Sequence, residues 1–208
     1  MITEPMTLFT DYVLAGVTAW LGWRLFGARE GQDARSFWAL AFAALAAAAA
    51  VGGSYHGFAS FPVVWKVTLL AAGIASFAML AGSAIAAASG HLRKLLLALA
   101  AAKLALYSLW MLAHDAFIYV IADSGVAMAV VAALHAGSAM RRRDRASLWM
   151  LGGVGVSVFA AGVQASGYTL HRNFNHNDLY HVIQTAAMLL FYLGARRLRD
   201  GSKEKAKE

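Results

Sequence analysis

Residues 171–198 read HRNFNHNDLYHVIQTAAMLLFYLGARRL, and this stretch decides which kind of fold the chain adopts. From Asp178 to Arg196 it is mostly apolar, with the roughly 20 residues that an α-helix needs to cross about 30 Å of hydrocarbon. Its front end, residues 171–181, instead holds three histidines, three asparagines and an aspartate. The stretch therefore predicts a membrane helix with a polar cluster at its start.

Six further segments repeat the apolar part of this pattern, without the alternation that is typical of barrel strands. Together they predict seven transmembrane helices, at about 8–27, 36–58, 62–89, 94–113, 116–138, 147–169 and 178–196. The first segment lacks the basic start and small-residue cleavage site of a signal peptide, so we expect it to remain as a helix. The predicted fold class is therefore all-α, a polytopic membrane protein.

The composition supports a membrane protein and excludes several kinds of site. Of the 208 residues, 60% are hydrophobic and 14% are charged, whereas a soluble domain is about 45–50% apolar and about 25% charged. The mean hydropathy is +0.58. The chain has no cysteine, which excludes disulfides, thiolate metal ligands and a cysteine nucleophile.

The basic residues predict the orientation of the chain in the membrane. Fifteen of the 18 lysines and arginines fall on alternate connections or in the C-terminal tail, and such residues mark the cytoplasmic side. They are Arg24, Arg29, Arg35, Arg93, Lys94, Arg141, Arg142, Arg143, Arg145, Arg196, Arg197, Arg199, Lys203, Lys205 and Lys207. We therefore expect the N-terminus outside and the C-terminus in the cytoplasm.

The same charge distribution bears on partners and location. Basic loops attract anionic lipid, so the net charge of +7 does not indicate nucleic acid. We expect an integral protein of the bacterial inner (plasma) membrane, with membrane lipids and a lipid or small amphiphilic substrate as partners. Residues 1–198 are predicted to form a single domain, and 199–208 a disordered polar cytoplasmic tail. The oligomeric state stays open.

Polar side chains from most of the predicted helices converge on the outer side. Ionisable groups within a membrane are costly and usually face a bundle interior or a wet cavity, often as functional sites. The outer layer comprises Asp11, His56, Lys66, His114, Asp115, Gln164, His171, His176, Asp178, His181 and Gln184. His91 and His135 lie near basic loops and are interpreted as interfacial.

Lys103 and Asp123 lie deeper than this layer. With a rise of 1.5 Å per residue, each is roughly 12–17 Å from the turn that connects their helices. The two side chains are therefore predicted to pair across neighbouring helices. Two interpretations remain: a structural ion pair, or a relay for protons or ions.

The start of the last helix has the residue types of a metal site. Asn177, His181 and Gln184 share one helix face, and Asp178 shares a face with His181, because spacings of three and four residues align. Imidazole and carboxylate groups that meet in this way can bind a divalent metal such as zinc. Helix capping is the alternative for Asn177 and Asp178, but it does not explain His181.

Two motifs resemble those of a known superfamily. NHNDLYHVIQTAAMLLFYLGARRL, at 175–198, is similar to the last helix of the CREST membrane hydrolases, and GGSYHGF, at 52–58, is similar to their second-span motif of serine and histidine. This superfamily includes alkaline ceramidases and progestin and adipoQ receptors. The resemblance implies seven spans and a zinc ion that activates water to cleave a lipid amide.

The resemblance also implies roles for individual residues. His56 becomes the second-span ligand and His181 the final ligand, and Ser54 is the serine of the second-span motif. The family's other last-span histidine falls on Asn177 here, with His176 beside it, so His176 or Asp178 is the candidate third ligand. The third span has Lys66 and lacks the family's aspartate.

The leading hypothesis is a metal-dependent hydrolase that cleaves an amide or ester of a lipid or amphiphile at the outer leaflet. A bound metal lowers the pKa of its water towards about 7, and Asp115 or Asp11 is the candidate general base. An alternative is a ligand-binding protein or transporter that uses the same polar layer, with Lys103 and Asp123 as a relay. A third hypothesis is haem held between His56 and His181.

Overall fold

The structure is a computed structural model, and it describes residues 3–58, 61–142 and 144–201. Within these residues there are seven helices, which confirms the all-α prediction. They are α1 (Pro5–Gly27), α2 (Asp33–Gly57), α3 (Pro62–Ala87), α4 (Gly90–Ala113), α5 (Ile118–Arg142), α6 (Arg145–Ser166) and α7 (His176–Ala195). Each begins and ends within a few residues of a predicted segment.

Local sequence explains several of the helix ends. Pro5 and Pro62 open α1 and α3, where a missing backbone N–H costs nothing. Asp144 caps the start of α6 by accepting hydrogen bonds from the backbone N–H groups of Ala146 and Ser147. Gly167 ends α6 with a φ of 67°, a left-handed conformation that glycine adopts without a steric penalty.

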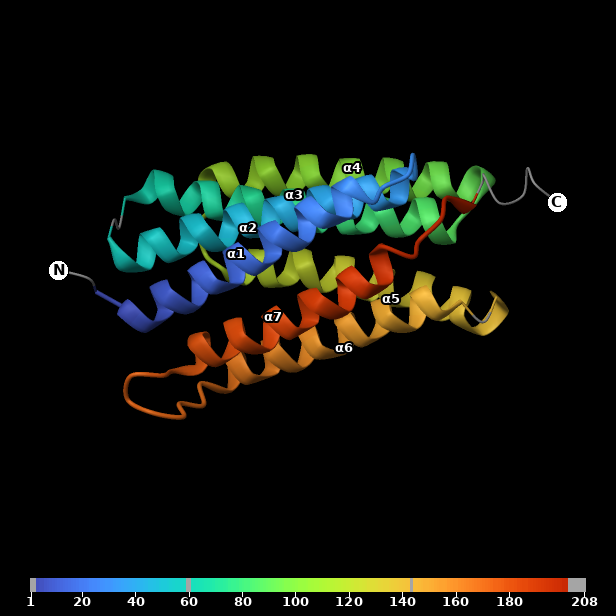
Figure 1. The fold of residues 1–208 in the computed structure, drawn as a ribbon. Helices are drawn as coiled ribbons and strands as arrows, with labels where there is room; N and C mark the ends of the chain where they lie inside the picture. The colour runs from blue at the N-terminus through green and yellow to red at the C-terminus, as the bar shows by residue number, and fades with distance from the viewer. Residues whose placement is uncertain (1–2, 59–60, 143, 202–208) are drawn as a thin grey trace.

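The helices run up and down along one long axis (Figure 1). The chain enters at one end of the bundle, which we call the N-terminal end, and leaves at the opposite one, the C-terminal end. The connections that follow α2, α4 and α6 lie at the N-terminal end, and those that follow α1, α3 and α5 at the C-terminal end. The basic connections predicted from the sequence therefore share the C-terminal end.

Six helices form a closed ring. α1 packs on α2, α2 on α3, α3 on α5, α5 on α6, α6 on α7, and α7 returns to α1. α4 stands outside this ring and packs mainly on α3. The contact between α1 and α7 thus closes the ring with the first and last helices of the chain.

The core of the ring is aromatic near the C-terminal half of α7. The rings of Trp38 and Phe191 stack with centroids 5.2 Å apart, and Phe42 is buried beside them. Because aromatic pairs in offset stacks gain about 0.5–1.5 kcal/mol beyond burial, this contact helps to fix α7 on α2.

Five of the helices in the described part of the chain, α2 to α6, are long and apolar enough to cross a membrane. α4 also exposes a row of apolar side chains, which suits contact with lipid better than contact with water. They include Leu95, Leu99, Leu106, Leu109 and Leu112. α1 and α7, which supply the main side chains of the site described below, are not among the five.

The packed chain extends three residues further than the predicted domain boundary at residue 198. The carboxylate of Asp200 is buried and accepts hydrogen bonds from the backbone N–H groups of Asp33 and Ala34, at 3.0 and 2.9 Å. Gly201 is also buried, close to the carbonyl of Ala86. Residues 199–201 therefore belong to the bundle rather than to the predicted tail, and 202–208 lie outside the described residues.

Candidate functional site

The candidate site lies where the start of α7 meets α1, at the N-terminal end of the bundle. Asn175 caps α7: its side chain accepts hydrogen bonds from the N–H groups of Asn177 and Asp178, and Asp178 Oδ2 accepts one from the N–H of Asn175 at 2.8 Å. This reciprocal arrangement is a capping box. The capping interpretation therefore accounts for one oxygen of Asp178, and the N-cap residue is Asn175 rather than Asn177.

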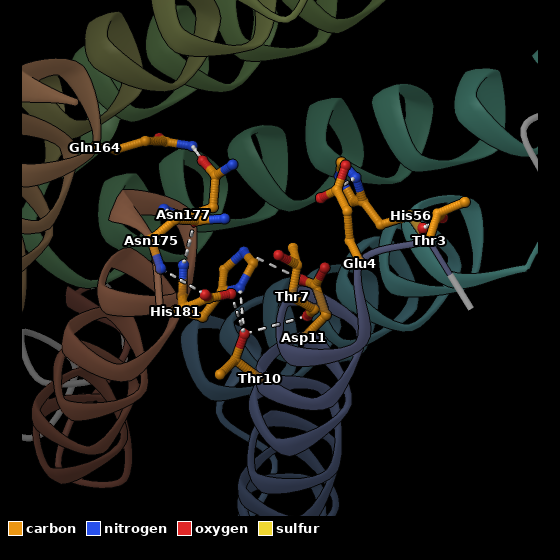
Figure 2. A network of polar contacts seen from close by, with 11 residues as sticks. Thr3, Glu4, Thr7, Thr10, Asp11, His56, Gln164, Asn175, Asn177 and His181 are labelled. Carbon is orange, nitrogen blue, oxygen red and sulfur yellow. Dashed lines mark hydrogen bonds and ion pairs between the residues drawn. The ribbon is translucent and has the colours of Figure 1, made fainter. Parts of the chain in front are cut away.

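The second carboxylate oxygen of Asp178 faces a side chain of α1. Thr10 Oγ1 lies 3.5 Å from Asp178 Oδ1 and 3.0 Å from His181 Nδ1, and 3.1 Å from the carbonyl oxygen of Thr7. Thr10 and Asp178 are both buried. One hydroxyl of α1 thus lies close to two polar side chains of α7, that of Asp178 and that of His181, and Figure 2 shows its contact with His181.

His181 makes its other contact with the next residue of α1. Its Nε2 lies 3.2 Å from Asp11 Oδ1, and the side chains are only 11% and 7% exposed. When Asp11 is ionised, it accepts the proton of Nε2, which leaves Nδ1 of a neutral ring free to accept the proton of Thr10. Asp11, His181 and Thr10 then form a continuous donor–acceptor chain.

A glycine of α2 makes room for this arrangement. A Cβ atom built on Gly53 would lie 2.7 Å from the Cβ of Asp11 and 3.3 Å from a ring carbon of Tyr12. Only a residue without a side chain lets α1 approach α2 this closely. Gly53 therefore sets the position from which Asp11 reaches His181.

His56 faces a different carboxylate. Its Nδ1 lies 3.3 Å from Glu4 Oε2, and its carbonyl accepts a hydrogen bond from the Thr3 hydroxyl. Figure 2 shows the two histidines turned toward separate acidic groups, with Thr7 between these groups on α1. Thr7 Oγ1 is buried and has no hydrogen-bond partner among the described residues. Glu4, Thr7 and Asp11 thus share one face of the first helix, because spacings of three and four residues align.

The amide side chains of the predicted layer tie α6 to α7. Gln164 Nε2 donates to Asn177 Oδ1 at 3.1 Å, and Gln184 Nε2 donates to Ser157 Oγ at 3.2 Å. His176 stands at the first position of α7, and its Nδ1 is buried without a hydrogen-bond partner among the described residues. These side chains border the site, and none of their hydrogen bonds among the described residues goes to the ring of His181.

Other predicted residues lie away from the site. The Ser54 hydroxyl contacts the Tyr12 hydroxyl at 2.9 Å and donates to the carbonyl of Ala50, so it faces Tyr12 rather than His56. Asp115 is exposed beyond the end of α4, and its carbonyl accepts a hydrogen bond from Trp65. Lys66 donates to the carbonyls of Met111 and His114, which end α4.

The predicted pair of Lys103 and Asp123 is confirmed between α4 and α5. Lys103 Nζ lies 2.5 Å from Asp123 Oδ1 and donates to Ser76 Oγ of α3 at 2.8 Å. Asp123 Oδ2 is buried without a hydrogen-bond partner in the described part of the chain. This pair joins α4 to the ring and is separate from the contacts of His181.

The donor atoms fit a zinc ion only in part. Asp11 Oδ1 and His181 Nε2 are adjacent, as two ligands of one ion are. Within the described residues, however, no three His, Asp or Glu side chains come together closely enough to hold a metal. Since a zinc site takes at least three protein ligands, the zinc hypothesis stays a prediction.

Three residues at the start of the chain, Glu4, Thr7 and Thr10, were not singled out from sequence. Their side chains are common on any helix, and only the fold shows that Thr10 contacts His181 and that Glu4 contacts His56. The sequence holds one sign of this arrangement. Glu4, Thr7 and Asp11 are spaced so that they fall on one side of a helix, in the most polar part of an otherwise apolar segment.

The family of unknown function DUF6962 matches residues 6–200, and the chain therefore belongs to this family. Neither the comparison with curated proteins nor the comparison with solved structures gives a match. The match spans all seven helices of the described chain, apart from the first residue of α1.

Proposed function

We propose that this member of the DUF6962 family is a membrane-embedded hydrolase that cleaves an ester or amide of a lipid or small amphiphile. The observation that carries the proposal is the chain of contacts from Asp11 through His181 to Thr10. A base held by a third group and placed within hydrogen-bond reach of a hydroxyl is the usual arrangement of nucleophilic catalysis. The resemblance to the CREST hydrolases supports the same reaction class.

In this proposal each residue of the chain has one task. Asp11 holds the proton of His181 Nε2 and so fixes which nitrogen of the ring is basic. His181 Nδ1 takes the proton of Thr10 Oγ1 as this oxygen attacks the substrate carbonyl carbon, and gives it to the alcohol or amine that leaves. Water then cleaves the acyl ester on Thr10 and releases the acid. Asp178 fixes the start of α7, the helix that carries His181, through the capping box. Burial of the whole group strengthens each of these electrostatic contacts.

The membrane placement of the site is part of the proposal. All seven helices span the membrane, with the N-terminal end outside and the basic C-terminal end in the cytoplasm, because lysine and arginine concentrate on the cytoplasmic side. The site then lies at the level of the outer leaflet of a plasma membrane, such as the bacterial inner membrane. The acyl chains of a lipid substrate would lie along the apolar surface of the helices.

Hydrolysis of p-nitrophenyl esters and of a fluorogenic N-acyl amphiphile by the purified full chain tests the proposal. We expect wild-type turnover, and a loss of about 10²–10⁴-fold in His181→Ala, the range of a general base. His171→Ala is the matched control, because His171 is an exposed histidine at the same end of the bundle and its ring accepts a hydrogen bond from Asn173 of its own loop. Equal rates in wild type and His181→Ala would refute the proposal.

Metal analysis of the same preparations tests the zinc prediction separately. Stoichiometric zinc in the wild type that is lost in His181→Ala supports a metal at this site. Zinc that persists in His181→Ala contradicts it. Activity that survives dialysis against a chelator assigns the chemistry to the side chains alone.

A second candidate rests on the ion pair of Lys103 and Asp123. A carboxylate with one buried oxygen and no second partner among the described residues is suited to take up a proton. A ligand-binding or transport protein would use it as a relay. Proteoliposomes with an internal pH dye test this candidate: proton flux that Asp123→Asn abolishes supports it, and an absence of protein-dependent flux counts against it.

A further inference from the structure

A cavity lies at the C-terminal end of the bundle, opposite to the site of His181. Its volume is about 250 Å³. The ends of α3 and α5, the start of α6 and the segment that follows α7 surround it. Its polar lining comprises His135, Ser138, Asp144, Ser147, Arg197 and Arg199. One water occupies about 30 Å³ of liquid, so the cavity admits a group much larger than a single water.

The inner wall of the cavity is a fixed chain of hydrogen bonds. His135 is 1% exposed, its Nδ1 lies 3.0 Å from Ser147 Oγ, and its Nε2 lies 3.2 Å from Ser83 Oγ. Ser147 donates its only hydroxyl proton to Asp144 Oδ2 at 2.8 Å. Its oxygen must therefore accept from His135, which places a proton on Nδ1. Contacts to two other helices hold this ring in one orientation.

The charges around the cavity favour an anion. Arg197 and Arg199 contribute two positive charges against the single carboxylate of Asp144 among the lining residues, a balance of 2 − 1 = +1. Both oxygens of Asp144 already accept hydrogen bonds from the first turn of α6. Its negative charge is thus compensated by the helix start.

The arginines remain available for a ligand. Arg197 donates one hydrogen bond, to the carbonyl of Leu193, and a guanidinium has five N–H donors. Arg199 is exposed and makes no hydrogen bond or ion pair within residues 3–201 as far as they are described. A planar guanidinium matches a phosphate with two parallel hydrogen bonds.

We propose that this cavity binds a phosphate group, with Arg197 and Arg199 as the cationic ligands of the phosphate. His135 and Ser147 form the inner wall of the cavity. The location favours the phosphate of an anionic phospholipid headgroup, because basic pockets between membrane helices bind such headgroups. The site is separate from the hydrolase site, and its existence does not depend on the proposed reaction.

Thermal unfolding of the full chain in a neutral detergent tests the binding. The added probes are sodium phosphate against sodium chloride at equal ionic strength, and dihexanoyl phosphatidylglycerol against dihexanoyl phosphatidylcholine. We expect a rise in melting temperature with phosphatidylglycerol, and an apparent affinity at least about 10-fold weaker in Arg197→Gln/Arg199→Gln, which corresponds to about 1.4 kcal/mol. Stabilisation by phosphatidylglycerol alone identifies the lipid as the source, and stabilisation by phosphate alone identifies the free anion.

The matched control removes two arginines from the same end of the molecule but not from the cavity. Arg141→Gln/Arg196→Gln has the same net charge as the cavity variant, and neither residue lines the cavity. Stabilisation by either phosphate probe that survives in this control and weakens in the cavity variant supports the proposal. No stabilisation of the wild type, or equal weakening in both double variants, would overturn it. Hydrolysis that stays normal in the cavity variant shows that the two sites fail independently.

Discussion

Asp11 of α1 and His181 of α7 place Oδ1 and Nε2 3.2 Å apart, and this contact joins the first helix of the chain to the last. It closes the ring of six helices at the N-terminal end, the end at which α6 connects to α7. The same two side chains belong to the candidate site. The packing of α1 on α7 and the proposed catalysis therefore depend on the same contact. Variants must be chosen so that a loss of stability can be told from a loss of turnover.

We expect Asp11→Asn to reduce hydrolysis by about 10²-fold or more, because the amide no longer fixes the proton of His181 on Nε2. In this variant the proton of the neutral His181 ring can sit on Nδ1, and Nδ1 then cannot accept the proton of Thr10. Turnover and melting temperature are measured on the same sample, and Asp115→Asn serves as the control because Asp115 is exposed at the same end. An Asp11→Asn protein with wild-type turnover would remove Asp11 from the mechanism.

The hydroxyl of Thr10 is predicted to matter more than its shape. Thr10→Val keeps the branched side chain and removes the oxygen that contacts His181 and Asp178. We expect Thr10→Val to abolish hydrolysis and Thr10→Ser to retain it within about 10-fold, since only the second keeps a nucleophile beside its base. Single-turnover assays with a p-nitrophenyl ester check this. Wild-type activity in Thr10→Val would show that water is the attacking oxygen.

The sequence predicts the helices well because their signal is local. An apolar run of about 20 residues must form its backbone hydrogen bonds internally in lipid, whatever its neighbours are. Capping is local too, and Asn175 and Asp178 act together at the start of α7 as a cap. The pair of Lys103 and Asp123 follows from depth alone, because both lie far from the turn between adjacent helices.

The contacts of the site that depend on how each helix is rotated about its own axis cannot be predicted from local sequence. Depth places His56 and His181 at one level, but the rotation of α2 turns His56 to Glu4 while His181 meets Asp11. His135 shows the same limit. Its closeness to a basic loop predicts its depth near the interface, but only the fold shows that it is buried between Ser83 and Ser147. Interhelical contacts of this kind need the packed structure.

Gly53→Ala is predicted to destabilise the protein and to disturb the site. The added methyl would lie 2.7 Å from the Cβ of Asp11, so α1 must move away from α2. Overpacking of this kind costs about 1–3 kcal/mol. Gly16→Ala is the matched control, because no neighbouring atom lies within 4 Å of its built Cβ. Denaturant titration in detergent compares the two, and equal stability would mean that the α1–α2 contact tolerates a methyl group.

Lys103→Met is predicted to destabilise the protein because it leaves the Asp123 carboxylate without its cation. Removal of one partner from a buried ion pair costs about 3–5 kcal/mol, whereas its replacement by apolar residues on both sides is often neutral. We therefore expect Lys103→Met/Asp123→Leu to be more stable than Lys103→Met alone. Unfolding titrations in mixed micelles measure both variants. A double variant that is as unstable as the single one would mean that Ser76, which also binds Lys103, carries the contact. Because α4 packs mainly on α3, the loss should appear first as exposure of α4 to hydrogen exchange.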